Sequence, residues 1–318
     1  MPGAAPAPFS GKEVSFVMKK SWLLPAAAVI GGVAGLLVRR LHLAHDFDPA
    51  SGLPVAQPAY ALPLYGITAV VLVVLLGLSL GKYRAFDRQF SSAFYSRTPF
   101  WFVVAAAGGV LLFAAGLLDL MEVFRPASLE LGAAVVQTTR AARILRLLLG
   151  VLSLLAGVGV YFTALNTRKK GEYRSGWFSL PGLTCCVWVM LSYQEWAKDP
   201  VVSHYVFPLL AALLAMVACY LIAAFAFGKG KVRAALFFAS AAAAVGIMLL
   251  ADGEALYLVS LRVGLILWLL SMAGCLADNA ARPAPPAVLP EGCAPADCAS
   301  CPGCTPTGEK PTLPDNND

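Results

Sequence analysis

Residues 205–227 read YVFPLLAALLAMVACYLIAAFAF, a run of 23 residues that contains no charged side chain. A helix that crosses the hydrocarbon core of a bilayer needs about 20 apolar residues, with a range of about 17–25. Hydrocarbon offers no hydrogen-bond partner to the backbone, so a chain that crosses it must form a helix. This run therefore predicts a transmembrane helix.

Seven further apolar runs of similar length lie on either side of it. Together they predict an all-α bundle of eight transmembrane helices, which forms a single domain over residues 22–278. The last two runs are separated only by Ala251-Asp252-Gly253-Glu254, which predicts a tight hairpin. The seven runs cover residues 22–38, 61–80, 100–120, 145–165, 177–193, 234–251 and 255–277.

The composition of the whole chain supports the same class of protein. Of 318 residues, 59% are hydrophobic and 13% are charged, and the mean hydropathy is +0.72. A soluble domain carries about 25% charged residues, so this composition excludes an ordinary globular enzyme. The sequence also lacks the P-loop and HExxH motifs. The protein is more consistent with a non-enzyme than with an enzyme.

The basic residues flank the apolar runs and predict the topology of the chain. Cytoplasmic loops of membrane proteins are enriched in Lys and Arg, so the net charge of +6 indicates membrane insertion and no nucleic-acid partner. With the N-terminus inside, 16 of the 24 basic residues become cytoplasmic, and the even number of helices returns the C-terminus to that side. The outer segment 125–146 runs against this bias, because it carries Arg125, Arg140, Arg143 and Arg146. We expect a bacterial plasma-membrane protein whose predicted partner is the lipid bilayer.

The two ends of the chain lie outside the predicted helical bundle. Residues 1–21 form a short cytoplasmic lead, and Met18 is a candidate for the true initiator. Residues 279–318 hold nine prolines and no apolar periodicity, which predicts a disordered tail. Its four closely spaced thiols could bind a soft metal such as zinc, or could be non-specific. They are Cys293, Cys298, Cys301 and Cys304.

One charged side chain stands out inside an apolar run. Arg262 lies roughly 10 Å into the last predicted helix, at about 1.5 Å per residue. Arginines at such depths usually face the bundle and pair with carboxylates, either as a structural ion pair or as part of a binding site. The candidate partners on the same side, which complete the predicted site, are Asp119, Glu122, Asp252 and Glu254.

Two other patterns concern metal binding and helix packing. His42, His45, Asp46 and Asp48 could together bind a divalent metal, although their spacing matches no zinc or calcium signature. Small residues at GxxxG spacing let helices approach closely in lipid. Gly31 and Gly35, and Gly77 and Gly81, have this spacing.

These features leave three functional hypotheses. The first is a permease or channel-like protein for a small, anionic solute reached from the outer side near Arg262. The second is a non-transporting scaffold, assembly or sensor protein that docks partners through its outer loops and tail. The third and weakest is an intramembrane enzyme.

Overall fold

In the computed structural model of the chain, the described residues form helices and short connections. Described are residues 11–48, 53–55, 58–81, 83, 93–96, 98–124, 140–168, 175–196 and 202–281. Within these ranges there is no β-strand, apart from an isolated bridge between Phe47 and Pro54. The predicted all-α class is confirmed.

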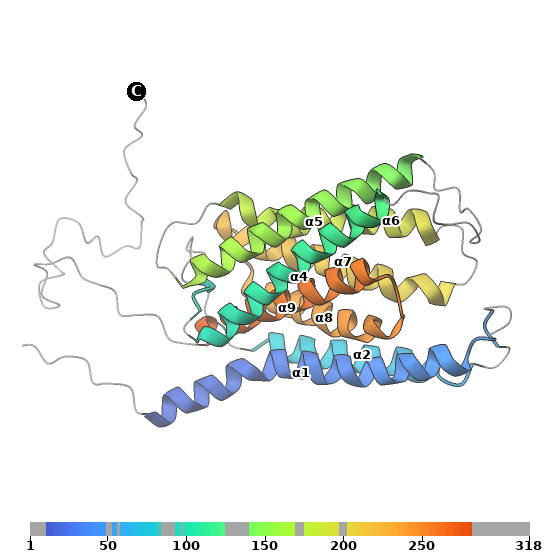
Figure 1. Ribbon diagram of the computed structural model, residues 1–318. Coiled ribbons are helices and arrows are strands. Elements are labelled where there is room, and N and C mark those ends of the chain that lie inside the picture. The colour runs from blue at the N-terminus through green and yellow to red at the C-terminus, as the bar shows by residue number, and fades with distance from the viewer. Residues whose placement is uncertain are drawn as a thin grey trace, which may run out of the picture. The chain divides into compact units, whose positions relative to one another are not determined.

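Eight α-helices make up the described bundle (Figure 1), together with two short 3-10 helices, η2 (Ser175–Ser179) and η3 (Leu249–Ala251). The α-helices are α1 (Gly11–His45), α2 (Ala61–Ser79), α4 (Pro99–Val123), α5 (Arg140–Thr167), α6 (Leu180–Trp196), α7 (Val202–Ala226), α8 (Val232–Met248) and α9 (Leu256–Ala280).

Seven of these helices are long and apolar enough to cross a membrane. The chain is therefore a polytopic membrane protein. The remaining helix, α6, has 17 residues, which is the lower limit for a crossing. Its predicted first residues, Trp177–Ser179, lie in η2, and the α-helix begins at Leu180 with Pro181 in its first turn, where proline is tolerated.

The first helix is longer than the apolar run that predicts it. The sequence suggests an end at Val38, before Arg39 and Arg40, whereas α1 continues to His45. Arg39 is buried and Arg40 is exposed. The two arginines therefore lie on different faces of one continuous helix.

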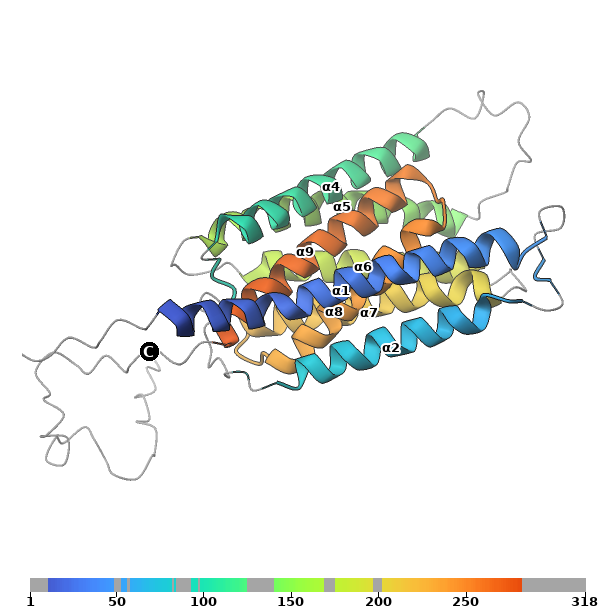
Figure 2. The same cartoon turned by 90° about the horizontal axis from the view of Figure 1, so that it is seen from below.

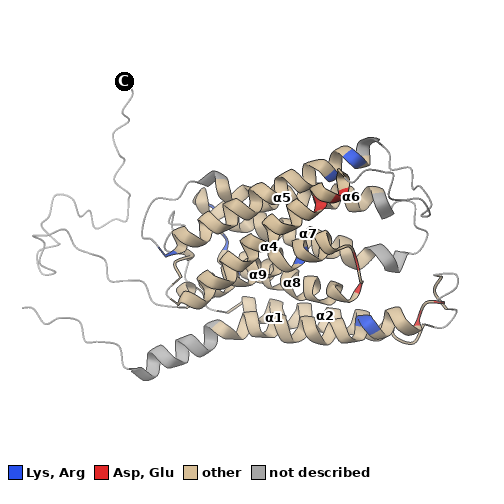
Figure 3. Cartoon of the chain, in the orientation of Figure 1, with Lys and Arg blue, Asp and Glu red and all other residues tan. Residues whose placement is uncertain are grey.

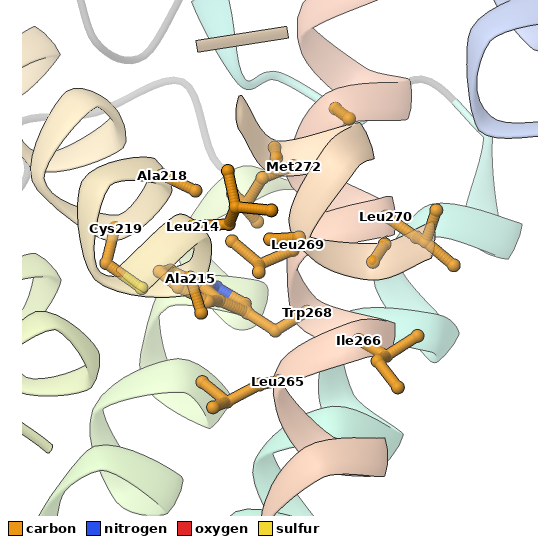
Figure 4. Packing of buried hydrophobic residues seen from close by; sticks show 14 of the residues in the cluster. Leu214, Ala215, Ala218, Cys219, Leu265, Ile266, Trp268, Leu269, Leu270 and Met272 are labelled. Carbon is orange, nitrogen blue, oxygen red and sulfur yellow. The ribbon is translucent and has the colours of Figure 1, made fainter. Parts of the chain in front are cut away.

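The α8–α9 hairpin forms the centre of the bundle. α8 packs against α1, α2, α7 and α9, and α9 also packs against α4. Figure 4 shows Trp268 of α9 pointing toward α7, beside Ala215. In contrast, α2 lies at the edge of the bundle (Figure 2) and exposes apolar side chains such as Leu62 and Val73, as expected for a helix in contact with lipid.

Glycines bring α4 into backbone contact with two of its neighbours, α5 and α9. A Cβ atom on Gly157 of α5 would lie 2.5 Å from the backbone nitrogen of Phe113, and one on Gly108 of α4 would lie 2.8 Å from the carbonyl oxygen of Gly264 in α9. Of the two GxxxG pairs noted in the sequence, Gly31 and Gly35 are packed against other helices, whereas no described atom lies within 4 Å of a Cβ on Gly77.

The helix directions alternate, so the connections gather at two ends (Figures 1 and 2). One end contains the last turns of α1, α4 and α8 and the first turns of α2, α5 and α9. We call it the ion-pair end, because it holds Arg39, Arg146, Arg262 and their carboxylate partners.

Candidate functional site

Charged residues are scarce in the middle of the bundle (Figure 3). At the ion-pair end, each of Arg39, Arg146 and Arg262 contacts at least one carboxylate and lies over one aromatic ring. Each pair joins elements that are distant in sequence or connects a helix to a turn. The three arginines are therefore held by the same kind of contact, but they differ in how completely it is made.

Arg262 of α9 contacts Glu254, which lies just before the same helix. Its Nη2 is 2.6 Å from Oε2 of Glu254, and its Nη1 donates a hydrogen bond of 3.2 Å to the carbonyl oxygen of Leu249. The side chain is only 2% exposed, and its guanidinium lies 5.7 Å from the ring centroid of Trp188 in α6. Neither Nε nor Nη2 has an aligned hydrogen-bond acceptor among the described residues, so the contact with Glu254 is an ion pair without a well-directed hydrogen bond.

A small pocket lies beside this arginine. It has room for about one water molecule. Four helices, α6, α7, α8 and α9, contribute to its wall, and apart from Arg262 and the indole of Trp188 the wall is aliphatic. The lining residues are Trp188, Ala211, Ala215, Ala242, Gly246, Arg262, Leu265, Ile266 and Leu269.

Arg39 of α1 makes a more complete contact with Asp252. Its Nε donates to Oδ1 at 2.9 Å and its Nη2 donates to Oδ2 at 3.4 Å. Both side chains are largely buried, and the guanidinium lies 5.2 Å from the ring centroid of Phe207. This two-point contact joins α1 to the α8–α9 connection.

A glycine allows one short turn to present both carboxylates. Gly253 lies between Asp252 and Glu254 and has a φ of 63°, a left-handed conformation that favours glycine. The turn therefore directs Asp252 to Arg39 on α1 and Glu254 to Arg262 on α9.

Arg146 of α5 forms ion pairs with both acidic residues of α4. Its Nε is 3.1 Å from Oδ1 of Asp119, its Nη2 is 2.5 Å from Oε2 of Glu122, and its guanidinium lies 4.7 Å from the ring centroid of Tyr257. Asp119 and Glu122 are three residues apart, so they share a helix face. This cluster joins α4, α5 and α9 and is partly exposed.

Among the residues predicted from the sequence to form one site, the structure brings Arg262 together with Glu254 only. Asp252 contacts Arg39, and Asp119 and Glu122 contact Arg146. The burial of Arg39 is not among the features predicted from the sequence. The signal that could have found it is the apolar pattern that continues after Arg40 through Leu41 and Leu43.

His42 and Asp46 link the end of α1 to the start of α2 by hydrogen bonds. His42 Nδ1 lies 2.8 Å from Oδ2 of Asp46, and the backbone N–H groups of Ala59 and Tyr60 each donate to Asp46 at 2.9 Å. Burial raises the pKa of the Asp46 carboxyl, but the hydrogen bonds from His42, Tyr60 and Ala59 outweigh this effect and lower the pKa below its usual value of 3.8. The carboxylate therefore stabilises the first turn of α2.

We expect Asp46→Asn to destabilise the protein in a pH-dependent way. Hydrogen bonds to a charged group contribute about 1.5–3 kcal/mol, and a lowered pKa means that this contribution is present above pH 3.8 and is lost as the pH falls through the folded-state pKa. Thermal unfolding in detergent should show a lower midpoint for the variant at neutral pH. The difference from wild type should shrink in acid, and a difference independent of pH would contradict the assigned role.

Within the described ranges, no group of three or more His, Cys, Asp or Glu side chains could hold a metal ion. His42 and Asp46 contact each other, and His45 contacts the carbonyl oxygen of Leu41. The tail cysteines, Cys293, Cys298, Cys301 and Cys304, lie outside the described residues, so a soft-metal site there stays a prediction.

The chain was compared with protein-family models, with curated proteins and with solved structures. None of these three comparisons found a match.

Proposed function

We propose that this polytopic membrane protein is a permease for a small anion, and that Arg262 forms the binding site. The observation that carries this proposal is that the buried guanidinium lines a pocket while Nε and Nη2 lack aligned acceptors among the described residues. A buried donor without an acceptor costs about 1–3 kcal/mol, and more when it is charged. An anion in the pocket would supply the acceptor.

The surroundings of Arg262 favour a small monovalent solute. The pocket is close to a water molecule in size, and its wall is otherwise mostly aliphatic. In such a low-dielectric environment, one positive charge attracts one negative charge strongly. A multiply charged solute would bring charge for which the described pocket wall offers no partner.

The topology suggests how the solute reaches the site. If the N-terminus is cytoplasmic, as the basic residues indicate, the ion-pair end faces the outside. Glu254 then lies between the outer solution and Arg262, because its side chain is 21% exposed and that of Arg262 is 2% exposed. Arg39 and Arg146 are expected to have structural roles, since their carboxylate contacts are more complete.

The test is anion uptake into liposomes that contain the purified full-length protein. Radiolabelled chloride and formate serve as probes. Arg262→Gln should lower the uptake rate about 10–100-fold, which corresponds to losing charge-assisted hydrogen bonds of about 1.5–3 kcal/mol. Arg40→Gln changes an exposed arginine of α1 near the same end and should leave the rate unchanged.

Arg262→Gln leaves Glu254 without its partner, so a second variant separates folding from function. Arg262→Gln combined with Glu254→Gln removes both charges and should elute in detergent as the wild type does, yet it should transport neither probe. Uptake of both probes by the wild type at the rate of protein-free liposomes would overturn the proposal. Undiminished uptake by the double variant would also overturn it.

A further inference from the structure

Arg39 and Arg262 present the same edge of the guanidinium in two different states. In Arg39, Nε and Nη2 bind the two oxygens of Asp252, at 2.9 and 3.4 Å. In Arg262, Nη2 lies 2.6 Å from one oxygen of Glu254, and neither Nε nor Nη2 has an aligned acceptor among the described residues. The first arginine shows what a filled edge looks like in this protein, and the second has an edge that is only partly occupied.

The remaining nitrogen of Arg262 fixes the direction of this edge. Nη1 donates to the carbonyl oxygen of Leu249, at the start of η3. The guanidinium plane is further held over the indole of Trp188. With one nitrogen anchored in this way, the two nitrogens without aligned acceptors form a preset fork, and the side chain that carries them lines the pocket.

The two N–H groups on one guanidinium edge match the two oxygens of a planar acceptor, such as a carboxylate. A spherical ion such as chloride can use this geometry less fully. Glu254 is itself a carboxylate at this edge, and the nearby wall includes Ala211, Ala215 and Ala242, which suit hydrogen or a methyl group. The contact with Glu254 is incomplete and its side chain is the more exposed partner, so it can be displaced.

We infer that the anion is a short monocarboxylate, of the size of formate or acetate, which replaces Glu254 on the Nε and Nη2 edge of Arg262. This inference rests on the proposed function and names its substrate class. In the occupied state, the two carboxylate oxygens accept from Nε and Nη2, and Glu254 moves toward the solution at the ion-pair end. Glu254 is then an internal competitor for the site.

The test compares formate and chloride uptake at equal concentrations. Liposomes are kept at mildly alkaline pH, where little of the membrane-permeable neutral acid is present, and the rate of protein-free liposomes is subtracted. The wild type should take up formate about tenfold faster than chloride, equivalent to about 1.4 kcal/mol of discrimination. Glu254→Gln should lower the half-saturating formate concentration several-fold, because the competing carboxylate is removed.

Arg262→Lys is the decisive variant, because lysine keeps the charge but lacks the planar fork. Its formate-to-chloride preference should fall close to one while it still transports. Arg39→Lys is the matched control and should keep the wild-type preference, since Arg39 is outside the pocket. Equal uptake of both ions by the wild type, or full preference in Arg262→Lys, would overturn the inference and leave the proposed function standing. If the wild type took up neither ion, both the inference and the proposed function would be overturned.

Discussion

Replacing Gly157 by alanine is expected to destabilise the bundle strongly, and replacing it by leucine is expected to prevent recovery of folded protein. The added Cβ atom would lie 2.5 Å from the backbone nitrogen of Phe113 and 2.7 Å from the carbonyl oxygen of Gly109. Backbone atoms cannot rotate away as a side chain can, so α4 and α5 must move apart. Overpacking typically costs about 1–3 kcal/mol, and helix separation adds the loss of neighbouring contacts.

Gly77→Ala is the matched control for this prediction. Gly77 also lies inside an apolar helix, but no described atom is within 4 Å of its Cβ position. Alanine favours helix over glycine by about 1 kcal/mol, so this variant should equal or exceed the wild type in stability. Thermal unfolding of detergent-purified protein at one scan rate would compare the two variants. Similar midpoints for Gly157→Ala and the wild type would contradict the close α4–α5 crossing.

The second large effect is expected at the Arg39–Asp252 pair. Arg39→Met removes the partner of a carboxylate that is only 9% exposed. Breaking a buried ion pair on one side costs about 3–5 kcal/mol, because the remaining charge is left uncompensated. We therefore expect a large drop in the unfolding midpoint, together with loosening of α1 from the α8–α9 turn.

Removing the second charge should recover much of the stability that Arg39→Met loses. Asp252→Asn in the Arg39→Met background leaves no uncompensated charge, and replacing a buried pair by uncharged groups is often neutral. Arg40→Met supplies the surface control and should change the stability by no more than about 0.5 kcal/mol, since Arg40 is exposed. An equal effect of Arg39→Met and Arg40→Met would show that the pair does not hold α1 in place.

Several helix bounds could be predicted from the sequence, and the one that could not has a physical cause. The apolar runs around residues 61–80 and 205–227 correspond to α2 and α7 within a few residues. The predicted end of the first helix at Val38 is too early, because two adjacent arginines indicate a helix end when only hydropathy is considered. Arg39 stays inside the helix because Asp252, 213 residues away, compensates its charge.

The candidate site was predictable in its chemistry and not in its partners. An arginine inside an apolar run requires a carboxylate, and the sequence offers four near the correct end. The choice of Glu254 depends on the left-handed turn at Gly253, which sends Asp252 to α1 and Glu254 to α9. The local sequence does not indicate which helix each of the two carboxylates faces.

The sequence by itself determined that this protein is a helical membrane bundle, because the length and polarity of each run decide whether it can lie in hydrocarbon. Only the tertiary structure decided which glycines form close crossings and which arginine keeps an incompletely occupied edge. Gly77 and Gly157 are both glycines in apolar helices, and Arg39 and Arg262 are both buried arginines. Their differences arise from neighbours on other helices or turns, since packing and ion pairing act between groups that are close in space.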